Sequence, residues 1–369
     1  NEVSISSPDD MLKKLALLPN GNSVSMTRCS IVDIPKLLLY LPKLISLDLS
    51  SNPIKSLEPL WESNLPNLRE LNIAACWLKS LPVGPPSFYL TLEVLNLDGN
   101  FLGQAPFGLQ ANFSVFPKLK TLSLVGNDYD TIPCLPERLE KLIFRLNQFS
   151  EIPQGSVIDF DASYSYIPHQ PSILSTQIQI LNLSHCGLSG TLIIPQMPFL
   201  DTLDVSNNSI SDIQFESTRR ITILRLSFNA IGSFPESISK LPMLRQLELA
   251  HNAIDRIPTD LTSFKRLESI DLSHNQLITG RLKLPSKIQA VRFAFNFSVS
   301  FESFPLSLRY VDVSFCSVVT FPPIPPSIEW LAVYFVHRII VSVKIRALTD
   351  DSSISTDPNQ QPADAESDD

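Results

Sequence analysis

The chain has 369 residues, of which 44% are hydrophobic, and it contains 30 prolines but only 11 glycines. Seven of its 37 acidic residues and none of its 29 basic residues lie within 350–369, so the rest is nearly neutral despite the net charge of −8. A neutral body argues against a nucleic-acid-binding protein, which needs a basic surface. No apolar run reaches the length of about 18 residues that a membrane-spanning helix requires.

The first twenty residues predict an N-terminal capping helix. Ser7, Pro8 and two acidic residues precede the apolar run MLKKLALL, and this composition is typical of a helix start. We therefore expect a helix over 8–18 and assign residues 1–20 to a cap. The segment NEVSISSPDD does not resemble a signal peptide, because no basic region is followed by an apolar one.

Residues 21–336 repeat one pattern, which is clearest in LRQLELAHNAIDRIP (Leu244–Pro258). Its Leu-x-Leu part alternates inward and outward side chains, as a β-strand does. The third residue after the second leucine is called here the asparagine position, because Asn holds it in most turns. In chain order it is occupied, at spacings of 18 to 27 residues, by Cys29, Asn52, Cys76, Asn100, Asn127, Asn147, Ser165, Cys186, Asn208, Asn229, Asn252, Asn275, Asn296 and Cys316.

A small polar side chain at the asparagine position should face the inside of each turn and pair with backbone groups that the bend leaves unsatisfied. We therefore expect these residues to form a structural ladder. The four cysteines among them lie whole turns apart, too far for disulfide bonds, and should be buried free thiols. Free thiols favour a reducing compartment, so a cytoplasmic location is expected.

The end of the chain departs from the repeat. Residues 328–333 predict a fifteenth strand, and 337–349 predict a capping strand because VSVKIRAL alternates apolar and polar residues. A segment entering a further domain is the alternative for 337–349. Residues 350–369 are acidic and poor in apolar residues, which predicts a disordered tail.

The pattern over 21–336 resembles the leucine-rich repeat superfamily. This resemblance implies an α/β solenoid of horseshoe shape. A parallel concave β-sheet of about 14–15 strands would face a convex side of extended chain, 3₁₀ turns and short helices. Turns 229–275 resemble the intracellular Ras-group type, while the proline-rich turns near 133–153 and 305–326 resemble a shorter, bacterial-effector-like class.

The residue between the two strand leucines should face outward on the concave side, and six of the fourteen such residues are acidic. A solvated sheet face and a binding strip fit this composition equally well. If the strip binds a protein, the regular half of the array is the better candidate, because its even spacing should give a continuous face. The predicted contact residues there are Asp204, Arg225, Glu248, Asp271, Arg292 and Asp312.

Aromatic residues and histidines often precede the asparagine position, namely Tyr164, His185, Phe228, His251, His274, Phe295 and Phe315. The aromatic residues are either anchors for a partner or packing at the corner between strand and loop, with packing slightly favoured. His251 and His274 fall on adjacent turns, but no third or fourth ligand is spaced for a metal. No metal or cofactor is therefore expected.

No P-loop, nucleophile elbow, zinc-protease motif or paired C-x-x-C occurs in the sequence. The leading hypothesis is a monomeric, non-enzymatic scaffold that binds a protein on its concave face in intracellular signalling. The Ras-group resemblance implies a small GTPase or another signalling protein as partner. One alternative is the recognition arm of a larger signalling enzyme, such as the PP2C-type phosphatases that similar protist arrays precede. The other is a secreted or surface receptor ectodomain.

Overall fold

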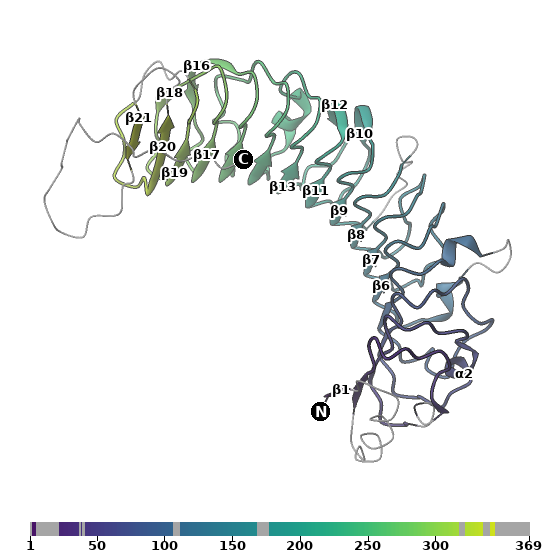
Figure 1. Ribbon diagram of the computed structural model, residues 1–369. Coiled ribbons are helices and arrows are strands. Elements are labelled where there is room, and N and C mark those ends of the chain that lie inside the picture. The colour runs from purple at the N-terminus through teal and green to yellow at the C-terminus, as the bar shows by residue number, and fades with distance from the viewer. Residues whose placement is uncertain are drawn as a thin grey trace, which may run out of the picture.

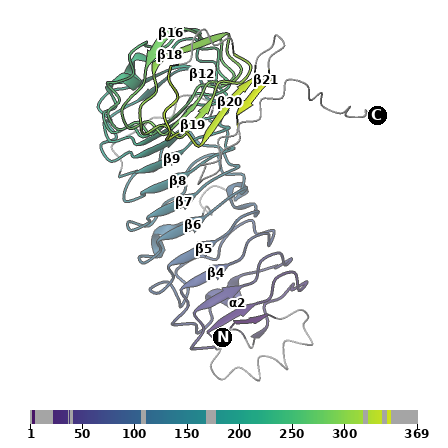
Figure 2. The ribbon, with the colours of Figure 1, turned by 90° about the vertical axis from the view of Figure 1, so that its left-hand side faces the viewer.

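The computed structural model describes residues 2–4, 22–36, 38, 41–105, 111–167, 177–316, 322–334 and 340–343. Within these residues the chain forms a curved solenoid, and one strand of each turn lies on the inner, concave side (Figure 1). Figure 2, turned by 90°, shows the strands side by side like the rungs of a ladder. The predicted solenoid with a parallel concave sheet is confirmed. The capping helix expected over 8–18 and the tail expected over 350–369 lie outside the described residues.

The concave sheet has 17 strands, most of them three residues long with one buried residue between two outward ones. Fifteen of these pair in parallel with their neighbours in chain order. They are β2 (Ser23–Ser25), β3 (Ser46–Asp48), β4 (Glu70–Asn72), β5 (Val94–Asn96), β6 (Thr121–Ser123), β7 (Lys141–Ile143), β8 (Asp159–Asp161), β9 (Ile180–Asn182), β11 (Thr202–Asp204), β13 (Ile223–Arg225), β14 (Gln246–Glu248), β15 (Ser269–Asp271), β17 (Ala290–Arg292), β19 (Tyr310–Asp312) and β20 (Trp330–Tyr334).

Two further strands extend the sheet at its ends. β1 (Glu2–Ser4), which the sequence pattern did not predict, pairs in parallel with β2. β21 (Ile340–Val343) pairs antiparallel with β20. Both pairings supply hydrogen-bond partners to strands that would otherwise be sheet edges.

The convex side is short and mostly extended. It holds the helix α2 (Glu58–Trp61), the 3₁₀ helices η2 (Leu102–Gln104), η3 (Phe113–Val115) and η4 (Glu236–Lys240), and two pairs of parallel strands. β10 (Ser189–Ile194) pairs with β12 (Ser209–Phe215), and β16 (Ile278–Lys283) pairs with β18 (Ser298–Ser303). Turns of about twenty residues that contain prolines leave no length for longer helices, which accounts for this outer wall.

One continuous hydrophobic core fills the space between the two sides. The central strand residues Leu203, Leu224 and Leu247 are fully buried, and each such side chain stabilises the fold by roughly 1.5–3 kcal/mol. In the shorter turns around β7 and β8, aromatic rings take over part of the filling. Phe149 packs edge-on against Phe144 and Phe160, with ring centroids 6.0 and 5.6 Å apart.

The asparagine position connects successive turns through the backbone, and Asn52 shows how. Its Oδ1 accepts hydrogen bonds from the backbone N–H groups of Cys29 and Ile31 in the previous turn, at 2.9 and 3.0 Å. Its Nδ2 donates to the carbonyl oxygens of Met26 and Leu49 at 2.8 and 2.7 Å. A single amide therefore satisfies backbone groups of two neighbouring turns.

The residue before the asparagine position has a left-handed backbone in all fourteen turns, with φ between 53° and 63°. This conformation turns the chain away from the strand; glycine adopts it without strain, and asparagine tolerates it better than most other residues do. Glycine holds the position twice, as Gly99 and Gly126. The other occupants are Arg28, Ser51, Ala75, Leu146, Tyr164, His185, Asn207, Phe228, His251, His274, Phe295 and Phe315.

Candidate functional site: the concave face

In the concave sheet, the last residue of each strand from β2 to β19 faces the concave side, and together these residues form what we call the central column; the convex strands β10, β12, β16 and β18 are not part of it. In the regular half of the array the sheet register pairs each column residue directly with the next one on the neighbouring strand. The six predicted contact residues are thereby brought into one row across six adjacent strands, in the order Asp204, Arg225, Glu248, Asp271, Arg292 and Asp312.

Many carboxylates and amides of the central column also have a structural task. In eight turns the side-chain Oδ1 accepts a hydrogen bond from the backbone N–H two residues further on, at 2.8–3.1 Å. The acceptors are Asp48, Asn72, Asn96, Asp161, Asn182, Asp204, Asp271 and Asp312. The acidic character of the column is therefore partly a requirement of the bend, a role that the sequence pattern did not reveal.

The charges of the central column are only partly compensated. Arg225 lies 3.4 Å from the carboxylate of Glu248, and the guanidinium of Arg292 lies over the ring of Tyr310, 4.8 Å from its centroid. Among the described residues, the half-buried carboxylates of Asp204, Asp271 and Asp312 have no salt-bridge partner. This half of the face therefore keeps an excess of negative charge.

A second row of charged residues lies directly before the concave strands and consists of ion pairs that the sequence pattern did not predict. Glu93 contacts Arg69 at 3.4 Å and Lys120 at 2.9 Å, and Arg245 contacts Glu268 at 2.7 Å. The hydrogen bond from Lys120 holds the pKa of the Glu93 carboxyl below its usual value. Because these residues occupy the same repeat position, directly before the strands of adjacent turns, the spacing of the repeats could have revealed the pairs. Such pairs add little stability, and they neutralise this row.

Just after the C-terminal ends of the strands, five rings from five successive turns stack on one another, and we call them the ring column. They are Phe228, His251, His274, Phe295 and Phe315. Successive centroids lie 4.0–4.4 Å apart, and the ring planes differ by 9–18°. Tyr164 and His185 form a separate stack at 4.1 Å. The packing expected at this corner is thus present, but every ring remains exposed to solvent.

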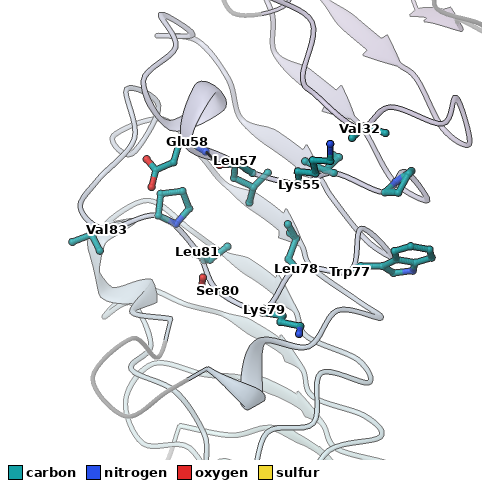
Figure 3. Close-up of a pocket in the computed structure, with 14 residues that line it drawn as sticks. Val32, Lys55, Leu57, Glu58, Trp77, Leu78, Lys79, Ser80, Leu81 and Val83 are labelled. Carbon is teal, nitrogen blue, oxygen red and sulfur yellow. Dashed lines mark hydrogen bonds between the residues drawn. The ribbon is translucent and has the colours of Figure 1, made fainter.

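A groove of about 660 Å³ lies away from these columns, between the second and third turns. Figure 3 shows it running from Trp77 to Val83, with Lys55 and Lys79 among its lining residues. Trp77 is 68% exposed and Val83 is 89% exposed. None of the predicted contact residues lines this groove.

The thiols and imidazoles do not assemble into a metal site in the part of the chain that the structure describes. None of the five cysteines forms a disulfide bond in the described part of the chain, and only Cys134 is exposed. Burial raises the pKa of the Cys186 thiol to about 12 and that of Cys316 to about 11. These thiols therefore stay protonated near neutral pH, which suits a packing role. No helix in the described ranges is long and apolar enough to cross a membrane.

Two family models match separate parts of the chain. The model described as "Leucine rich repeat" matches residues 219–277, and the model described as "Leucine Rich repeats (2 copies)" matches residues 25–84. The first segment contains β13 to β15 of the concave sheet, and the second begins at the last residue of β2 and contains β3 and β4.

Two curated relatives match over longer stretches. Receptor-like protein 35 of Arabidopsis thaliana is 27% identical over 236 residues, which cover 58% of this chain and 23% of that protein. The adenylate cyclase of Podospora anserina is 26% identical over 252 residues, covering 66% of this chain and 10% of that protein. The chain thus spans less than a quarter of the length of either relative.

Solved structures with the same fold cover nearly the whole array. A leucine-rich repeat protein of Leptospira interrogans superposes with a TM-score of 0.62 at 17% identity, covering 90% of this chain and 96% of that one. The leucine-rich effector protein YopM of Yersinia pestis gives a TM-score of 0.54 at 22% identity, covering 82% and 87%. At these identities the likeness is one of fold.

Proposed function

Because the chain belongs to the leucine-rich repeat superfamily, whose fold is a common protein-interaction scaffold, we propose that it is a non-enzymatic binding protein. It holds a protein partner on the concave face of β11, β13, β14, β15, β17 and β19. The observation that carries this proposal is the central column of this half, in which six charged residues stand in one row on adjacent strands. A row fixed by sheet register presents its charges at fixed spacing, as a selective surface requires.

The charge of the row defines the partner. Three carboxylates, those of Asp204, Asp271 and Asp312, lack ion pairs within the described chain, while the charge of Arg225 is compensated by Glu248. The partner therefore presents a mainly basic surface. Complementary charges of this kind raise the association rate and select the partner, and their effect weakens as salt screens them. The Ras-group resemblance of turns 229–275 supports a signalling protein, such as a small GTPase, inside the cell.

The test replaces Asp204, Asp271 and Asp312 together by asparagine. Asparagine removes the charge and keeps the Oδ1 acceptor, as Asn72 and Asn182 already do at the same position in other turns. Proteins from the source cell are captured on the wild-type chain and on this variant at low salt, then quantified by mass spectrometry. We expect a partner that binds the wild type to be lost from the variant. Equal capture by a variant with an unchanged unfolding transition would refute the concave-face proposal.

The recognition arm of a larger signalling enzyme is the alternative that the adenylate cyclase similarity favours, since the matched repeats cover only 10% of that protein. A PP2C-type phosphatase is the other enzyme class that such an array could serve. Sequencing the transcript beyond residue 369 separates these possibilities from a free-standing scaffold. An open reading frame that continues into a cyclase or phosphatase domain would replace the scaffold proposal.

A receptor ectodomain is supported by the similarity to receptor-like protein 35. Of the Asn-x-Ser/Thr sites in the chain, Asn112 is exposed, whereas Asn296 is only 6% exposed and its amide is used in the asparagine ladder. Glycan analysis at Asn112 of the native protein tests this alternative. An unmodified Asn112 favours a reducing compartment, which five cysteines without a disulfide bond in the described part of the chain support.

A further inference from the structure

The ring column is a continuous surface feature of the C-terminal half. Its five rings follow one another without interruption from Phe228 to Phe315, while Asn207 separates it from the stack of Tyr164 and His185. Phe228 is 49% exposed, and Phe295 and Phe315 are each 45% exposed. The faces of the rings cover one another, so the exposed fraction is mainly their edges, which form a ribbed apolar strip. Exposed apolar strips with polar borders commonly mark binding surfaces.

The fold does not require rings at this position. In the N-terminal half none of the residues at the same left-handed position is a ring, although the neighbouring strands pair in the same parallel register; the occupants are Arg28, Ser51, Ala75, Gly99, Gly126 and Leu146. A bulky side chain is strained in this conformation, whereas glycine or asparagine is not. Five successive turns nevertheless carry rings, and strain retained at an exposed position points to a function beyond folding.

The ring column runs beside the uncompensated acids of the central column. In each turn the ring is the third residue after the central-column residue, so His274 accompanies Asp271 and Phe315 accompanies Asp312. An apolar strip and a negative strip thus run side by side across the same strands.

We propose that the ring column and the acids beside it bind an extended protein segment in which apolar and basic residues alternate. Successive side chains of an extended chain point to opposite sides, so one set would cover the ring edges while the other would meet Asp271 and Asp312. Aromatic members of the apolar set would place their faces against the ring edges, an arrangement that aromatic pairs favour. This inference rests on the proposed function, because it specifies which part of the partner lies on the concave face.

The probe is a phage-displayed library of random linear peptides, selected on the full chain. Enriched peptides are synthesised, and their affinities are measured by fluorescence anisotropy. The test variant replaces all five rings by asparagine. Asn207, which holds the same repeat position, already has this left-handed backbone, with φ 56°. Should this variant not fold, the double change Phe295→Asn and Phe315→Asn takes its place. The matched control, Phe297→Asn with Leu306→Asn, removes residues that are 62% and 79% exposed and lie outside the column.

We expect the enriched peptides to alternate apolar with Arg or Lys residues, to bind the ring variant about tenfold more weakly, and to bind the control as the wild type does. Peptides that bind the ring variant as tightly as the wild type would overturn the inference. If their affinity depends on Asp204, Asp271 and Asp312 but not on the rings, the proposed function stands and only the ring column is excluded. If no enriched peptide depends on either set, both proposals fail.

Discussion

At the residue scale, the asparagine position shows how much one amide contributes to this fold. Asn52 is 1% exposed and joins two turns through five hydrogen bonds to backbone groups. Cys76 holds the same position in the next turn, where its Sγ donates to the carbonyl oxygens of Leu49 and Ala74 at 3.3 and 3.4 Å. The thiol thus replaces the donor function of the amide but only weakly its acceptor function.

We therefore predict a graded series at residue 52. Asn52→Leu leaves donors and acceptors of two turns unpaired in the core, each costing about 1–3 kcal/mol. Asn52→Cys keeps a donor and should cost less than the leucine change. Urea unfolding of the three proteins measures the order. Equal destabilisation by leucine and cysteine would mean that packing, and not hydrogen bonding, governs this position.

The thiols give a second residue-scale prediction. Burial raises the pKa of the thiols at the asparagine position, whereas Cys134 is exposed. In the native protein at pH 8, Ellman's reagent should therefore react quickly with one thiol and with all five only after denaturation. Cys134→Ser is the control and should abolish the fast phase. A fast phase that persists in this variant would place another thiol at the surface.

Tyr129 carries a buried hydroxyl that has no hydrogen-bond partner within the described chain. Its ring packs against Phe144, with centroids 5.7 Å apart. Tyr129→Phe should stabilise the protein by about 1 kcal/mol, because it removes an unsatisfied polar group and keeps the ring. Exposed Tyr164→Phe is the matched control with no expected gain. A loss of stability in Tyr129→Phe would show that the hydroxyl has a partner, such as a buried water.

At the element scale, the strand positions were predictable and the side-chain networks were only partly so. The concave strands from β2 to β20 follow from the alternation of the repeat, because each needs only one buried residue between two outward ones, whereas the convex strands β10, β12, β16 and β18 do not follow from it. The hydrogen bond from Ser273 N–H to Asp271 depends on the bend after the strand, which the alternation does not encode. Stacking of His251 on Phe228 depends on a left-handed backbone at both residues, which their identities disfavour.

The ring column also makes the stability of the fold depend on pH, because it contains His251. Partial desolvation lowers the pKa of His251, with His274 acting in the same direction and Asp271 opposing it. The unfolded chain therefore binds a proton at this site at higher pH than the folded chain does. The stability that neutral His251 contributes is fully present above its unfolded-state pKa of about 6.5. This contribution is lost as the pH falls through the lower pKa of the folded state.

His251→Phe tests this linkage, because phenylalanine stacks equally well on a neighbouring ring in this column, as Phe295 does on His274 at 4.2 Å. We expect the free energy of unfolding of the wild type to fall more between pH 7 and pH 5 than that of the variant. Urea titrations at several pH values give both slopes. Equal pH dependence of the two proteins would show that the pKa of His251 is not lowered in the folded state.

At the scale of the whole molecule, curvature and charge act together. The solenoid bends so that the strands line its inner side (Figure 1), and the central column of the regular half faces that concavity. The charges directly before the strands are paired, as in the contact of Arg245 with Glu268. Four of the six acids of the central column lie in the regular half, three of them without an ion pair within the described chain, which is the basis for assigning the partner to that half.

Hydroxyl-radical footprinting of the chain with its captured partner tests this assignment most directly. The radicals oxidise exposed aromatic side chains, and the chain carries such probes on both surfaces at issue: Tyr310 and Trp330 on the concave strands, and Trp77 at the separate groove. We predict that the partner protects Tyr310 and Trp330 and leaves the oxidation of Trp77 unchanged. Protection of Trp77 with unchanged oxidation of Tyr310 and Trp330 would contradict the concave-face account and place the partner in the groove.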